Sequence, residues 1–116
     1  MILADYLLPT AVVAFFGWRM ISSALARKRI PGLLDQGGQV VDVRTTGEFA
    51  AGHAPGSVNI PLADLEHGTK ALDRNRPVIL CCASGTRSAM ACRTLRTQGF
   101  TQIMNGGSWR NLPRRP

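Results

Sequence analysis

The chain has 116 residues, 45% of them hydrophobic and 18% charged, with a formal net charge of +7 at pH 7. That length holds one domain with a single modest core and an extension. The charge comes from arginines spread over both termini and the last predicted helix, with no basic stripe interleaved with aromatic residues. It therefore suits an anionic membrane surface and small anionic ligands, and we expect no nucleic-acid partner.

Residues 1–29 are expected to form an N-terminal hydrophobic helix that anchors the chain in a membrane. The stretch Tyr6–Trp18 is uncharged and mostly apolar. Extended from Ile2 to Leu25, with Arg19 reaching toward the lipid headgroups, it attains the roughly 20 residues that a membrane-spanning helix needs. This segment, residues 2–25, is the predicted membrane contact.

The charges after this segment predict its orientation. Arg27, Lys28 and Arg29 form a basic cluster on the carboxyl side. By the positive-inside rule, this cluster makes a single-pass anchor with the rest of the chain facing the cytoplasm. Three alternatives stay open: a cleaved signal peptide, which makes the protein exported, a peripheral helix lying in the membrane interface, and a helix packed on its own domain.

Residues 30–113 are expected to form one α/β domain, followed by a short basic tail at 114–116. The predicted strands are Gln39–Val43, Val58–Ile60, Val78–Cys81 and Thr101–Asn105, and the predicted helices are Thr46–Ala51, Ala63–Leu72 and Arg87–Gln98. Strands that alternate with helices predict a parallel sheet flanked by helices, with right-handed crossovers.

The segment that follows the third predicted strand is the most informative about chemistry. It reads Cys82-Ala83-Ser84-Gly85-Thr86-Arg87-Ser88. This order of strand with a terminal cysteine, short glycine-containing loop and helix is typical of an anion site. The N–H groups of the loop and of the helix start converge on the thiol. These groups and the arginine favour the thiolate. Cys82 is therefore the candidate catalytic nucleophile, and the six residues after it are the candidate binding loop.

This loop resembles the active loop of the rhodanese (sulfurtransferase) family, C-x-x-G-x-R-S. Two more segments agree, with small departures at Ala54 and Ser57: residues 40–61, which carry Asp-Val-Arg, Glu-Phe and a Gly-His-Ala-Pro-Gly turn, and Asn105-Gly106-Gly107 before Trp109. The resemblance covers roughly residues 30–112 and implies a rhodanese-like parallel sheet. The family usually begins with a strand and a helix, for which only Ile30–Gln36 is available here, so we expect that layer to be shortened or replaced.

The resemblance implies a rhodanese-type sulfurtransferase. Such an enzyme moves a sulfane sulfur from an anionic donor such as thiosulfate to a thiol or cyanide through a persulfide on Cys82. No cofactor is needed, and no metal site is expected, because His53 is interpreted as a hydrogen-bonded turn residue and no ligand cluster stands near either histidine. The alternative is a sulfur-carrier or docking module in which another protein accepts the sulfur.

A minor alternative depends on spacing. Cys82 and Arg87 make C-x4-R, which suits a single sulfur atom, whereas Cys81 and Arg87 make the C-x5-R of the dual-specificity phosphatases. Neighbouring strand side chains point to opposite faces, so only one sulfur can enter the loop, and the position of Gly85 favours Cys82. Cys81 and Cys92 are interpreted as core residues, and the three cysteines form no disulfide framework, which favours a reducing compartment.

Asp42, Arg44 and Glu48 are candidate pocket or supporting residues. Asp42 and Arg44 stand at the carboxyl end of a predicted strand, where ligands bind in open α/β sheets. The competing interpretation is an Arg44–Glu48 ion pair that fixes the loop. We expect Arg87 to neutralise loop carbonyls, and Ser88 either to cap the helix or to share a hydrogen bond with the sulfur.

Overall fold

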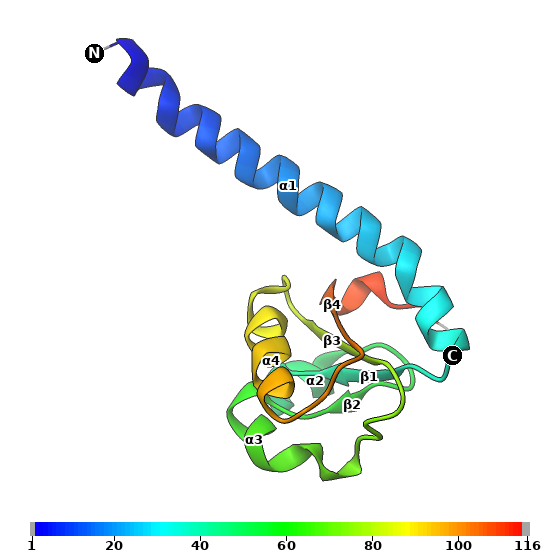
Figure 1. Cartoon of the computed structure of the whole chain (residues 1–116). Helices are drawn as coiled ribbons and strands as arrows, with labels where there is room; N and C mark the ends of the chain where they lie inside the picture. The colour runs from blue at the N-terminus through cyan, green and yellow to red at the C-terminus, as the bar shows by residue number, and fades with distance from the viewer. Residues whose placement is uncertain (1, 115–116) are drawn as a thin grey trace.

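A long helix, α1 (Ile2–Asp35), leads into a small sheet in the computed structural model, which describes residues 2–114 (Figure 1). The boundary expected between residues 29 and 30 falls inside α1. Residues 115 and 116 of the expected basic tail lie outside the described residues.

The sheet has four parallel strands in the order β2-β1-β3-β4, which confirms the expected fold class. The strands are β1 (Gln39–Asp42), β2 (Val58–Asn59), β3 (Val78–Cys82) and β4 (Ile103–Ser108). The helices after α1 are α2 (Thr46–Ala51), α3 (Leu65–Gly68) and α4 (Thr86–Thr97), with short 3-10 turns at Leu62–Asp64, Thr69–Ala71 and Trp109–Asn111. All residues of β3 are buried, as expected of an apolar strand in the middle of a parallel sheet.

Two apolar clusters lie on the two faces of the sheet. On one face α4 packs Ala91, Cys92 and Leu95 against alternate residues of β1 and β3. On the other face Ile30 of α1, which is fully buried, packs with Ile79 of β3. The last turns of α1 therefore replace the missing amino-terminal layer, and no strand precedes β1 in the described part of the chain.

The amino-terminal part of α1 projects beyond the domain (Figure 1). Its large apolar side chains are exposed, including Leu8 at 75%, Val13 at 71% and Trp18 at 65%. Among the described residues this is the one helix long and apolar enough to cross a membrane by length and composition, which makes it a candidate anchor.

Two elements differ in detail from the sequence prediction. The helical stretch expected over Ala63–Leu72 is found at Leu62–Ala71, where a 3-10 turn, the four residues of α3 and a second 3-10 turn follow one another. An added Cβ at Gly68 would lie 2.7 Å from Ile60 Cγ2, and glycine is a poor helix former, which fits the end of α3 at this residue. Strand β4 begins and ends later than expected and runs through Gly106, where an added Cβ would lie 2.9 Å from Ile79.

Candidate functional site

The loop from Cys82 to Thr86 wraps around one sulfur atom. Cys82 is the last residue of β3 and Thr86 the first of α4, so three residues make the turn. The backbone N–H of Gly85 donates to Cys82 Sγ at 2.9 Å. Gly85 has φ +101°, and a Cβ there would lie 3.2 Å from Gly107 Cα. This backbone conformation favours glycine at position 85.

The surroundings of Cys82 favour the thiolate. Burial raises the pKa of the thiol, but hydrogen bonds from the Ser88 hydroxyl and from the amides of Ser88, Ser84 and Gly85 together lower the pKa of Cys82 below its ordinary value. These donors stabilise negative charge on whatever sulfur occupies the loop.

Asn105 connects β4 to this loop and was given no role by sequence analysis. Ser88 Oγ lies 3.5 Å from Cys82 Sγ and donates to Asn105 Oδ1 at 2.6 Å. Asn105 Nδ2 donates to the carbonyl of Gly85 at 3.0 Å, and the N–H of Gly107 donates to Asn105 Oδ1 at 2.9 Å. Ser88 thus shares a hydrogen bond with the sulfur and does not cap α4. The available signal was a polar residue directly before two glycines at the end of a strand.

Cys81 points to the opposite face of the sheet, as the alternation of strand side chains predicts. It packs with Ile30, Ile79 and Leu112 in the second apolar cluster. Burial, reinforced by the nearby charge of Asp42, raises the pKa of Cys81 to about 12. The thiol is therefore neutral near pH 7, and the phosphatase spacing counted from Cys81 lacks an ionised nucleophile.

The predicted ion pair between Arg44 and Glu48 is wrong, because each residue has another partner. Arg87 Nη1 and Nη2 donate to Glu48 Oε1 and Oε2 at 2.6 and 2.9 Å. These bonds, with help from the Thr45 backbone, hold the pKa of Glu48 at about 2. Thr45 and Glu48 also form a capping box at the start of α2. Arg87 therefore fixes α4 to α2. We expected its guanidinium to bind the carbonyls of the loop, but it binds the Glu48 carboxylate instead.

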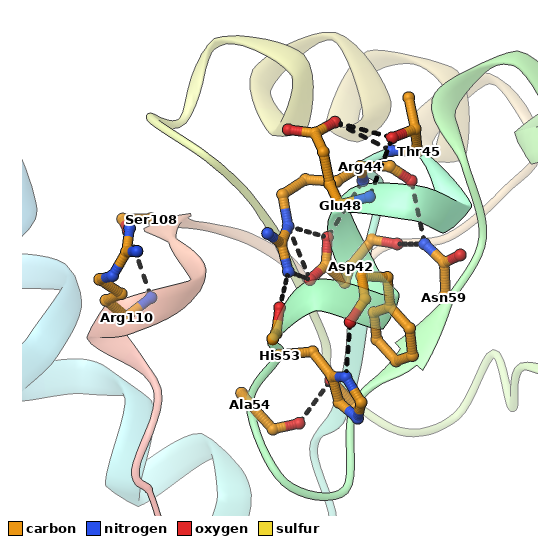
Figure 2. A network of polar contacts seen from close by, with 12 residues as sticks. Asp42, Arg44, Thr45, Glu48, His53, Ala54, Asn59, Ser108 and Arg110 are labelled. Carbon is orange, nitrogen blue, oxygen red and sulfur yellow. Dashed lines mark hydrogen bonds and ion pairs between the residues drawn. The ribbon is translucent and has the colours of Figure 1, made fainter.

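Arg44 instead forms a buried pair with Asp42 (Figure 2). Arg44 Nη2 lies 2.8 Å from Asp42 Oδ2 and also donates to the carbonyl of Gly52 at 2.7 Å. The guanidinium lies 4.7 Å from the centre of the Trp109 ring. Asn59 donates from Nδ2 to the carbonyls of Asp42 and Arg44. Both charges are thus satisfied inside the protein, away from a pocket mouth.

His53 lies in the turn that follows α2. Its Nδ1 is 2.8 Å from the carbonyl of Phe49, and its ring stacks on the Phe49 ring with 3.7 Å between centroids (Figure 2). The interpretation of His53 as a hydrogen-bonded turn residue is confirmed. Within residues 2–114 no group of three or more His, Cys, Asp and Glu side chains could hold a metal ion.

Comparison with known proteins agrees with this geometry. A family model described as a rhodanese-like domain matches residues 26–109. The chain is 36% identical over 87 residues to a thiosulfate sulfurtransferase, GlpE, of Pseudomonas fluorescens, covering 69% of this chain and 80% of that protein. It is 39% identical over 71 residues to the putative sulfur carrier protein YrkF of Bacillus subtilis, covering 61% of this chain and only 38% of YrkF. Among solved structures, a rhodanese with anions from E. coli superposes with a TM-score of 0.60 at 29% identity, covering 66% of this chain and 94% of that one.

Proposed function

The chain belongs to the rhodanese-like sulfurtransferase family, and from this premise we propose that it transfers the sulfane sulfur of an anionic donor such as thiosulfate through a persulfide on Cys82. The observation that carries the proposal is the hydrogen bond from the Gly85 amide to Cys82 Sγ, in a loop that lowers the pKa of that thiol. No residue outside the chain and no cofactor is required for either step.

In the first step the Cys82 thiolate attacks the outer sulfur of thiosulfate. A new S–S bond forms, the old S–S bond breaks, and sulfite leaves with the bonding electron pair. Cys82 then carries a terminal sulfur with one negative charge. The amide of Gly85 already donates to the first sulfur, and Ser88 Oγ lies 3.5 Å from it, so the loop is placed to stabilise the developing charge.

In the second step a thiolate or cyanide attacks the terminal sulfur. The S–S bond of the persulfide breaks and the electron pair returns to Cys82, which regenerates the thiolate. The loop of Ala83, Ser84, Gly85, Thr86, Arg87 and Ser88 is the proposed binding loop. Asp42, Arg44 and Glu48 serve as support: they fix the segment after β1 and the start of α4 and do not touch the sulfur.

The proposed domain organisation is an N-terminal membrane anchor followed by a rhodanese-like domain on the cytoplasmic side. Residues 26–35 of α1 belong to the folded domain by their packing, since Ala26 and Ile30 are 6% and 0% exposed. The part available to a bilayer is therefore the projecting part of α1, which ends near Trp18. This stretch is at the short end of the roughly 17–25 residues seen in membrane spans.

A sulfur-carrier function is the second candidate, and the likeness to the protein named as a putative sulfur carrier favours it. Both functions begin with the same persulfide on Cys82 and differ in the second step. A carrier passes the sulfur to a partner protein and turns over slowly with cyanide or small thiols, whereas an enzyme turns over with either.

Intact mass measurement tests the shared step. Reduced full-length protein exposed to thiosulfate should gain one sulfur atom, about 32 mass units, and lose it to cyanide or to a reducing thiol. Cys82→Ser should gain nothing, and the matched Cys81→Ser variant should gain the same mass as the wild type. An unmodified mass in the folded, reduced wild-type protein would contradict the proposal.

A further inference from the structure

The N-terminal helix touches the catalytic loop directly. Arg19 Nη2 donates to the carbonyl of Ser84 at 2.5 Å, across 65 positions of the sequence. A cavity of about 440 Å³ lies at this junction, between α1 and the loop. Its polar lining includes Arg19 from α1, Ser84 and Thr86 from the loop, and Asn105 from β4. The helix expected to anchor the chain, with packing on its own domain as an open alternative, thus forms one wall of a cavity beside the loop.

The cavity reaches the loop that holds the reactive sulfur at Gly85. Gly85 lines the cavity, and the amide of the same residue donates to Cys82 Sγ. The hydroxyls of Ser84 and Thr86, which lie 3.5 Å apart, also line it. An anion held in the cavity would therefore lie next to the loop that carries the nucleophile.

Of the three arginines discussed near the loop, Arg19 is the one available to bind such an anion. Arg87 is bonded to Glu48 and Arg44 to Asp42, so each of these two cations is neutralised by a carboxylate. Arg19 donates to a neutral carbonyl, and among the described residues no carboxylate lies within ion-pair distance of it. A guanidinium has five N–H donors, so the bond to Ser84 leaves donors for a second acceptor.

We propose that Arg19 and the cavity between α1 and the loop bind the anionic group of the sulfur donor, so that the N-terminal helix supplies a substrate-binding residue to the domain. The inference deepens the proposed sulfur transfer and rests on it for the identity of the donor. A sulfonate oxygen of a thiosulfate-like donor matches the donors of this lining, which include the Arg19 guanidinium, the hydroxyls of Ser84 and Thr86 and the amide of Asn105.

The test compares alkylation of Cys82 by an anionic and a neutral reagent. Iodoacetate and iodoacetamide both react with the thiolate, so a change in its pKa cancels in the ratio of their rates. We expect the iodoacetate/iodoacetamide ratio of the full chain in detergent at low salt to fall about two- to fivefold in Arg19→Gln. Arg19→Lys should keep most of the ratio, and Arg29→Gln, which removes an exposed charge from the same helix, should leave it unchanged.

Sulfur-transfer kinetics provide the second readout. In Arg19→Gln the KM for thiosulfate should rise with little change in kcat, because binding is weakened and the loop around Cys82 is intact. A wild-type ratio together with a wild-type KM in Arg19→Gln overturns the anion site while leaving the sulfur-transfer proposal in place. A lowered ratio in a protein that forms no persulfide with thiosulfate supports the anion site and contradicts the proposed donor.

Discussion

The two faces of the sheet at the end of β3 give two neighbouring cysteines opposite chemistry. Cys81 and Cys82 are both buried, at 0% and 1% exposure. Cys81 faces the apolar layer under α1, where burial raises its pKa to about 12. Cys82 faces the start of α4, where the amides of the loop and the Ser88 hydroxyl lower its pKa. Burial alone therefore does not decide thiol reactivity; the hydrogen-bond donors aimed at the sulfur do.

Exchanging sulfur for oxygen at each position is expected to give the largest difference between the two faces. Cys82→Ser should lose sulfur transfer by at least about a thousandfold, because an alcohol is hardly ionised near neutral pH. Cys81→Ser should retain most of the activity, with Cys81→Ala as a control for placing a hydroxyl in the apolar layer. Thiocyanate formation from thiosulfate and cyanide measures the activity of each variant. An inactive Cys81→Ala variant would indicate that Cys81 is the nucleophile.

Truncation of α1 tests the layer that covers Cys81. A chain beginning at Ser22 keeps Ala26 and Ile30 and should be soluble and folded. A chain beginning at Pro31 loses the fully buried Ile30, and deleting such a side chain costs about 2–5 kcal/mol. Chemical denaturation of the two truncated chains should show this difference. Equal stabilities would mean that α1 does not complete the domain.

The backbone on the Cys82 side can be disturbed at Gly85. Gly85→Ala places a Cβ at φ +101° and 3.2 Å from Gly107 Cα, which should displace the amide that donates to Cys82 Sγ. We expect persulfide formation to slow by about tenfold or more, in line with the loss of one aligned donor. Gly47→Ala on α2 is the matched control, because a Cβ there meets nothing within 4 Å. A wild-type rate of persulfide formation in Gly85→Ala would show that the Gly85 amide does not contribute to the reaction.

The smallest expected effect is a shift in the pH profile of Cys82. Because the pKa of this thiol is lowered, the alkylation rate should reach half its maximum at a pH below the ordinary thiol value of about 8.5 and should fall as the pH drops through that midpoint. Ser88→Ala removes one donor and should move the midpoint upward. Ser108→Ala, whose hydroxyl caps the turn at Trp109, should not move it. Identical pH profiles for wild type and Ser88→Ala would show that the Ser88 hydroxyl does not lower the pKa of Cys82.

The sequence could predict the parts of the fold and site that depend on local pattern. The opposite directions of the Cys81 and Cys82 side chains follow from the alternation of side chains along a strand. The strand, the loop with Gly85 and the helix depend on residues close together in the sequence, and all three are found. The parallel sheet follows from strands that alternate with helices.

Side-chain pairings between distant segments could not be predicted from the same information. Glu48 lies four residues from Arg44 and 39 from Arg87, yet it pairs with Arg87 because α2 and α4 meet beside the loop. Arg19 was interpreted as reaching for lipid headgroups, whereas its guanidinium binds the carbonyl of Ser84. Both depend on where helices dock, and no local pattern near these residues encodes that placement.

The most direct test of the account is to locate the sulfur that thiosulfate delivers. The full chain in detergent should be treated with thiosulfate under reducing-agent-free conditions, digested, and fragmented by mass spectrometry between residues 81 and 82. We expect the additional 32 mass units, roughly the mass of one sulfur atom, to lie on Cys82 and Cys81 to stay unmodified. Sulfur found on Cys81, or equally on both residues, would contradict the assignment of the nucleophile to the face of the sheet that meets α4.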